Sequence, residues 1–435
     1  MFIVYDKSNP ITARKGRLIY LQNVLHHLDS PHSPFMKEYA AQDIVSFQVL
    51  QRDLLTNETV IISSDGQKVT LKTGGPYTVE DKHDIYVGDI WVMAGQSNMR
   101  GHGFLKEAFG KKDESEKMPD HVHLFDSTET WRVASDPTHR LSLSKRSVHH
   151  TLPDPTVRNP DICKYRGASL GPSFGLHYGI PVGLIASAHG GVTLNDWKRP
   201  SELNTETRNA TLYGAMMDRI QKVGAIAGVL WYQGESDTED INNAESYGDR
   251  FRQWLCMLRA DTRPDLPVVV VQLGSHRVDI VDTVKNWKTV QDQQRQLQDN
   301  YTACIGSIDC GLDDRVHLSK DGLYILGKRL ARAANLVLKG KTDDVTPSPK
   351  LATYEEIVYV PKFASIHSIK LEFNLPEHFR FECNGDVTGF EIESKAVILR
   401  SRIEDDKKSI RLYLSGEPES WARLYFASLS RFSGR

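Results

Sequence analysis

The sequence is poor in cysteine, and the few cysteines it has are scattered. Five occur in 435 residues, an odd number without a Cys-x-x-Cys pair. This pattern argues against both a disulfide framework and a zinc ribbon. We expect the cysteines to behave as small buried apolar residues. Cys304 and Cys310 lie close in sequence, so one local bridge between them stays open.

The chain also lacks an excess of charge and a long apolar run. Lys+Arg number 54 and Asp+Glu 56, for a net charge of −2, so no basic field favours a nucleic-acid partner. No apolar run reaches the roughly 18 residues of a membrane span, and the first residues contain no signal-peptide core. As written, we expect a cytoplasmic protein without a membrane partner, or a periplasmic or secreted one if a leader was removed. The oligomeric state stays open.

Short strand patterns occur near both ends of the chain. Residues 58–71 hold two apolar runs around an Asp-Gly pair, which is typical of a β-hairpin. Apolar side chains alternate with period two over residues 369–373 and again over residues 379–383. We therefore predict β-rich modules at residues 1–88 and 348–435.

The middle of the chain follows a different pattern. Continuous apolar runs, typical of strands buried on both faces, occur at residues 90–94, 181–186, 227–232, 267–272 and 302–306. Helical patterns separate the later runs, which predicts a three-layer α/β domain over residues 89–340. Residues 106–166 fit neither pattern, and a loop of that length is usually functional or mobile. The role of this segment stays open.

Residues suited to acyl transfer follow several of these runs. Active sites of open α/β sheets lie at the carboxyl ends of the strands. Ser97 follows the first run, and Asp314 and His317 follow the last. A serine nucleophile needs an imidazole base, and the imidazole needs a carboxylate to orient it. We therefore predict Ser97 as nucleophile, His317 as base and Asp314 as the orienting group, with the neighbouring Asp313 as the alternative.

Acyl transfer also needs hydrogen-bond donors for the oxyanion. The candidates are the N–H of Ser97, the side-chain amide of Gln233 after the third run, and the N–H of Gly190 or Gly191 after the second. The sequence does not decide between the two glycines.

At these positions the chain resembles the SGNH hydrolase superfamily. Within it, the chain is similar to the sialate O-acetylesterase type and to the related acetylxylan esterases of carbohydrate esterase family 6. The matching strings are GQSNM at 95–99, the glycine turn with its tryptophan at 190–197, WYQGE at 231–235 and DRVH at 314–317. Glutamine stands at 233, where SGNH enzymes typically carry asparagine, as it does in the sialate-esterase branch.

The resemblance implies an α/β/α fold with a flavodoxin-like parallel sheet, flanked by the two β modules. It also implies a serine esterase that needs no metal or cofactor and removes acetyl groups from sugar hydroxyls through an acetyl-serine intermediate. An O-acetylated sialic acid is the preferred substrate, and acetylxylan or another acetylated polysaccharide is the alternative. A non-catalytic carbohydrate-binding protein is the alternative from another class.

Further residues beside the strand ends are candidates for a substrate pocket. They are Gln96, Arg100, His102, His189, Trp197 and Glu235. Other histidines stand in pairs, at 121 and 123 and at 149 and 150, without a second pair at zinc spacing. We therefore expect no metal site.

Overall fold

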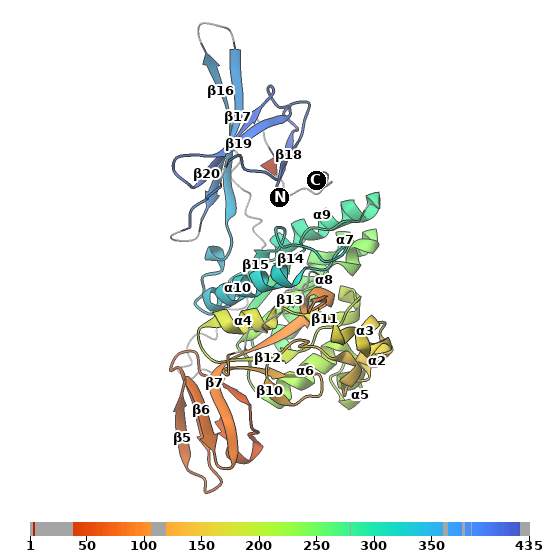
Figure 1. The fold of residues 1–435 in the computed structure, drawn as a ribbon, viewed down its shortest axis with the longest axis vertical. Coiled ribbons are helices and arrows are strands. Elements are labelled where there is room, and N and C mark those ends of the chain that lie inside the picture. The colour runs from red at the N-terminus through yellow and green to blue at the C-terminus, as the bar shows by residue number, and fades with distance from the viewer. Residues whose placement is uncertain are drawn as a thin grey trace. The chain divides into compact units, whose positions relative to one another are not determined.

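The structure is a computed structural model. It describes residues 3–4, 38–105, 119–278, 280–359, 364–375, 379–383 and 385–426 (Figure 1). One compact unit spans residues 32–342, and the other comprises the described residues from 343 onward together with strand β1 (Ile3–Val4). In the described part of the chain, no helix is long and apolar enough to cross a membrane.

The larger unit contains a sheet built around the long strand β7. The strand order is β10-β9-β12-β7-β13-β14-β15, parallel throughout except for the edge pair β9 and β10. These strands are β7 (Lys82–Gly95), β9 (Val122–Phe125), β10 (Trp131–Val133), β12 (Val182–Ala186), β13 (Gly228–Tyr232), β14 (Val268–Gln272) and β15 (Thr302–Gly306). The five predicted strands are all present. Every residue of β12 and β13 is buried, which is why the sequence shows continuous apolar runs there.

Helices lie between these strands in sequence and after the last of them. They are α1 (Ser97–Arg100), α2 (Val148–Thr151), α3 (Pro155–Arg158), α4 (Gly171–Tyr178), α5 (Thr205–Ala210), α6 (Leu212–Val223), α7 (Ile241–Glu245), α8 (Tyr247–Asp261), α9 (Val281–Arg295) and α10 (Lys320–Val337). A two-stranded pair, β8 (Gly103–Phe104) with β11 (Arg166–Ala168), lies outside the main sheet.

Tryptophans pack helices onto both faces of the sheet. Trp91 of β7 contacts Phe174 of α4, with ring centroids 6.1 Å apart. Trp231 of β13 contacts Trp254 of α8 at 4.4 Å. Trp231 pairs with Ala94, an odd number of positions from Trp91, so the two tryptophans point to opposite faces. Helices α4 and α8 therefore lie on opposite sides of a mixed α/β core.

A smaller β region precedes this sheet in the same unit. It contains β2 (Glu38–Ala40), β3 (Val49–Gln51), β4 (Glu58–Ile62), β5 (Lys68–Lys72) and β6 (Gly74–Val79). Strands β4 and β5 form the predicted hairpin, and β3 and β6 pair with the first half of β7. The predicted boundary after residue 88 falls inside β7. The division of the chain into three domains stays a prediction.

The second unit is a β structure, as predicted. Its four-stranded antiparallel sheet runs β16 (Ser348–Tyr359), β17 (Ala364–Asn374), β20 (Ser409–Leu414) and β19 (Ile398–Ile403). A second sheet contains β1, β21 (Arg423–Phe426) and β18 (Phe390–Glu393). The hydrophobic core of this unit includes the buried side chains of Ile369, Leu371 and Leu412. Residues 379–383 form no strand, contrary to the prediction. Among the described residues, a single backbone bond pairs this stretch, from the N–H of Phe381 to the carbonyl oxygen of Lys407.

None of the five cysteines, which all lie in the described part of the chain, forms a disulfide, so Cys304 and Cys310 form no bridge. Cys310 is buried as expected, whereas Cys256 and Cys383 are exposed, and for these two the expectation of burial is wrong. Cys256 points outward because it lies on the solvent side of α8, between the buried positions 255 and 258.

Candidate active site

The end of β7 places Ser97 at the first residue of α1. Gly95 has φ +136°, and a Cβ at this position would lie 2.1 Å from the carbonyl oxygen of Tyr232. Only glycine therefore allows β7 and β13 to approach so closely where the chain turns. Ser97 follows this turn with 7% of its surface exposed. The predicted nucleophile thus lies at the carboxyl edge of the central strand.

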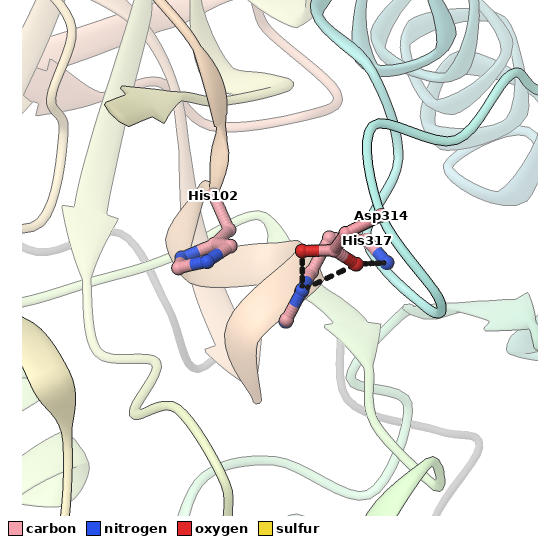
Figure 2. Close-up of side chains that lie close together, drawn as sticks. All are labelled: His102, Asp314 and His317. Carbon is pink, nitrogen blue, oxygen red and sulfur yellow. Dashed lines mark hydrogen bonds and ion pairs between the residues drawn. The ribbon is translucent and has the colours of Figure 1, made fainter. Parts of the chain in front are cut away.

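His317 connects Ser97 with Asp314. Its Nε2 lies 2.9 Å from Ser97 Oγ, and its Nδ1 lies 2.8 Å from Asp314 Oδ2 and 3.0 Å from Oδ1. Figure 2 shows the Asp314 carboxylate against the imidazole, both on the loop that leads into α10. The structure thereby brings together three residues that the sequence predicted as one catalytic set.

The Asp314 carboxylate is held by its own loop. Its Oδ1 accepts hydrogen bonds from the N–H groups of Val316 at 3.0 Å and His317 at 2.9 Å, and Arg166 Nη1 lies 3.1 Å from Oδ2. Burial opposes ionisation of Asp314, but the bonds from His317 and Val316 outweigh it and hold the pKa well below its ordinary value. Asp313 is turned away, because its Oδ2 accepts from the N–H of Phe104 at 2.9 Å.

His102 packs against the imidazole ring of His317. The two ring centroids are 4.1 Å apart (Figure 2). Arg100 Nη2 lies 2.8 Å from His102 Nδ1, so this nitrogen accepts and the proton is on Nε2. Burial, together with the neighbouring His317 and Arg100, lowers the pKa of His102 to about 3. The ring is therefore uncharged at neutral pH.

The glycine turn after β12, Gly190–Gly191, packs against the buried ion pair of Arg100 and Asp154. A Cβ on Gly190 would lie 2.2 Å from Asp154 Oδ2, and Asp154 Oδ2 is 3.3 Å from Arg100 Nε. Gly191 has φ +67°. Within the described residues, the N–H groups of Ser97, Gly190 and Gly191 donate to no protein acceptor. Their role as oxyanion donors stays a prediction.

The side chain of Gln233 lies in a network beside the turn. Its Nε2 is 2.6 Å from Asp237 Oδ2, 3.1 Å from the Val192 carbonyl oxygen and 3.2 Å from Gln96 Oε1. Gln96 Oε1 also accepts from the N–H groups of Gly234 and Ser236. The amide protons of Gln233 therefore face protein acceptors. Its role in the oxyanion hole and that of Gln96 in a pocket stay predictions.

Three other predicted pocket residues lie in the interior. Trp197 is 0% exposed and packs on Trp231, with ring centroids 5.2 Å apart. His189 is also fully buried, with Nδ1 3.0 Å from Nδ1 of His149, and burial lowers its pKa to about 4. Glu235 is buried beside Asn98. In this structure none of the three side chains has an open surface to offer a ligand.

Sequence reasoning missed two contributors, Asp154 and Arg166. Both lie in the segment without periodicity, of which residues 106–118 are outside the described part. Asp154 was detectable as a helix N-cap followed by proline, and it does cap α3 through Thr156. No local pattern marks Arg166, because its role depends on a loop that is distant in sequence.

One group of side chains in the described residues has donor atoms close enough for a metal ion: His102, Asp314 and His317. Its donor atoms already have partners. His102 Nδ1 faces Arg100, and both oxygens of Asp314 lie within hydrogen-bond distance of His317. The hydrogen bonds among these groups are those that a serine hydrolase requires.

The hydrogen-bonded Ser–His–Asp arrangement has the geometry on which serine hydrolases rely. Residues 87–335 match the sequence profile of the family described as carbohydrate esterase, sialic acid-specific acetylesterase. The chain belongs to this carbohydrate esterase family and is a carboxylic ester hydrolase, as the resemblance in sequence predicted.

Individual relatives share only a low sequence identity with this chain. A probable carbohydrate esterase of Arabidopsis thaliana is 28% identical over 281 residues, which are 60% of this chain and 97% of that protein. Human sialate O-acetylesterase is 24% identical over 212 residues, 38% of this chain and only 37% of that protein. A carbohydrate acetylesterase from Xanthomonas citri has a similar fold, with 20% identity, a TM-score of 0.57 and coverage of 88% of this chain and 96% of that one.

Proposed function

We propose that the chain hydrolyses O-acetyl esters of sugars through an acetyl-serine intermediate, with Ser97, His317 and Asp314 as the catalytic set. The observation that carries the proposal is the continuous pair of hydrogen bonds from Ser97 Oγ to His317 at 2.9 Å and from His317 to Asp314 at 2.8 Å. We also propose that the sheet and its helices form the three-layer SGNH arrangement, which the positions of α4 and α8 on opposite faces support.

In the first step, Ser97 Oγ attacks the acetyl carbonyl while His317 Nε2 takes the hydroxyl proton. The charged imidazole is stabilised by the ionised Asp314 at Nδ1. The new C–O bond forms to Ser97, and the carbonyl oxygen becomes an oxyanion. His317 then gives its proton to the departing sugar oxygen, which leaves as a hydroxyl.

In the second step, water attacks the acetyl-serine ester. His317 removes a proton from the water and returns it to Ser97 as acetate leaves. The N–H of Ser97 and the N–H of Gly190 or Gly191 stabilise the oxyanion in both steps. The contact between Gly190 and the Arg100–Asp154 pair supports this assignment, because it fixes the turn before substrate binds.

The first test is Ser97→Ala, measured by acetate release from small acetyl esters and acetylated sugars. Ser173→Ala is the matched control, because Ser173 is also a buried serine but bonds to the Tyr324 carbonyl at 2.6 Å in the packing of α4. We expect Ser97→Ala to abolish turnover in a folded protein and Ser173→Ala to keep it. Wild-type turnover by the Ser97 variant would refute the mechanism.

We propose an O-acetylated sialic acid as the substrate, supported by the family description and by the human relative. The second candidate is acetylated xylan. Comparing kcat/KM for acetate release from the two substrates decides between them, and a higher value for acetylxylan would overturn the sialate assignment. Sugar binding without acetate release from any acetylated sugar would instead favour the non-catalytic alternative.

A further inference from the structure

Asn98 contacts the backbone on both sides of His317. It directly follows the nucleophile in α1 and is 1% exposed. Its Oδ1 accepts from the N–H of Leu318 at 2.9 Å, and its Nδ2 donates to the carbonyl oxygen of Val316 at 3.1 Å. One amide thus holds the residues immediately before and after the predicted base.

Glu235 holds the NH₂ end of this amide. Its Oε1 lies 2.7 Å from Asn98 Nδ2, and the carboxyl is buried at 6% exposure. A carboxylate accepts hydrogen bonds but does not donate them, so it must face the NH₂ end of the amide. Oδ1 is then directed to Leu318. The mechanism proposed above gives the buried Glu235 carboxyl no other task.

Other contacts hold the loop, but they start from elsewhere in the fold. Asp313 bonds to Phe104, and the N–H of Arg277 donates to the Arg315 carbonyl oxygen at 2.8 Å. Asp314 of the same loop contacts Arg166 of β11, which is also not part of the nucleophile's helix. Asn98 is adjacent to Ser97 and therefore connects the base directly to the nucleophile's own helix.

We propose that Asn98 is a positioning residue that sets the distance between Ser97 Oγ and His317 Nε2, and that Glu235 sets the orientation of Asn98. The inference rests on the proposed function, since it concerns the same nucleophile and base. A displacement of about 1 Å between reacting groups costs on the order of 100-fold in rate. This is the size of effect expected when the two backbone contacts of Asn98 are lost.

The experiment compares Asn98→Ala and Asn98→Asp with Asn335→Ala. Asn335 is the matched control, because its Nδ2 also donates to two backbone carbonyls, those of Tyr178 and Ala331. We expect both Asn98 variants to lose about 100-fold in kcat with little change in KM. The rate at which an organophosphate labels Ser97 should fall in parallel. Asn335→Ala should lower Tm and keep kcat.

Asn98→Asp keeps the acceptor for Leu318, removes both donated bonds and puts a second carboxylate beside Glu235. Glu235→Ala leaves Asn98 in place, so it tests the proposal even if the Asn98 variants do not fold. Glu235→Gln retains an acceptor oxygen and should keep most of the activity, whereas Glu235→Ala should lose it. In the Asn98→Ala background, Glu235→Ala should add nothing. Additive effects of these two changes would overturn the role of Glu235.

The failure of the inference is distinguishable from the failure of the proposed function. If the organophosphate labels wild-type protein at Ser97 and labels the Asn98 variants at the same rate, the positioning role is refuted alone. If it does not label Ser97 in the wild type, as read by mass spectrometry, the proposed mechanism is refuted and the positioning role with it.

Discussion

Replacing Asp314 by Asn should disable the base while leaving its surroundings in place. Oδ1 of Asp314 accepts from two backbone N–H groups, so the carbonyl oxygen of an asparagine would keep that position. The NH₂ group would then take the place of Oδ2, which lies 2.8 Å from His317 Nδ1 and 3.1 Å from Arg166. A donor at this position forces the proton of His317 onto Nε2, the atom that must accept from Ser97.

The expected loss is about 10⁴-fold in kcat, the size seen when a triad aspartate becomes asparagine. That corresponds to about 5 kcal/mol of transition-state stabilisation. Asp313→Asn is the control, because an asparagine there can still accept from the N–H of Phe104. Its activity should stay close to that of the wild type. The assay is hydrolysis of a chromogenic acetate ester, repeated on an acetylated sugar.

The pH dependence of stability and activity is a second test of the role of Asp314. Because hydrogen bonds hold the pKa of Asp314 below its unfolded value, its carboxylate stabilises the fold above about pH 4. This contribution is lost only as the pH falls further, so any loss of wild-type activity between pH 5 and 8 belongs to another group.

Full activity in Asp314→Asn combined with loss in Asp313→Asn would refute the assignment and identify Asp313 as the orienting group.

Two further predictions concern stability. Gly190→Ala puts a Cβ 2.2 Å from the buried Asp154 carboxylate, so it should lower the free energy of unfolding by about 3 kcal/mol and also lower kcat. Gly191→Ala is strained only by φ +67° and should lower the free energy of unfolding by about 1 kcal/mol. The opposite ranking of the two variants in chemical denaturation would contradict this packing. Burial raises the pKa of Asp136 to about 7. The folded state then holds an extra proton above pH 4, and stability falls as the pH rises toward 7. Asp136→Asn should remove about 2 kcal/mol of this fall between pH 5 and 7, and an unchanged slope in urea titrations would refute it.

The sequence predicted those parts of the molecule that leave a local periodicity or a motif. The runs at 181–186 and 227–232 are continuous because β12 and β13 are buried on both faces, so they were recognisable as strands. Ser97 directly follows β7, and His317 lies in the loop between β15 and α10. Open α/β sheets bind their ligands at the edge where such loops follow the strands. The prediction failed at residues 379–383, because alternation of side chains does not supply a partner strand.

Side-chain direction was not predictable from the motifs. The WYQGE string placed Gln233 beside the site, but the sequence does not reveal that Asp237 and Val192 would accept its amide protons. Trp197 was equally ambiguous, and its burial against Trp231 depends on how η4 (Leu194–Trp197) packs on α8. Such choices are made by neighbours distant in sequence, so a single chain without its fold leaves them open.

The segment that sequence reasoning could not interpret contacts both ends of the site. Asp154 pairs with Arg100 beside Gly190, one of the candidate oxyanion donors. Arg166 contacts Asp314, and its guanidinium lies 4.2 Å from the centre of the Phe104 ring. The first contact is between fully buried charges, and removing one partner of such a pair typically costs about 3 to 5 kcal/mol. The described part of this segment, residues 119–166, therefore contributes Asp154 and Arg166 to the candidate site, where their charges contact groups beside the glycine turn and at the Asp314 carboxylate.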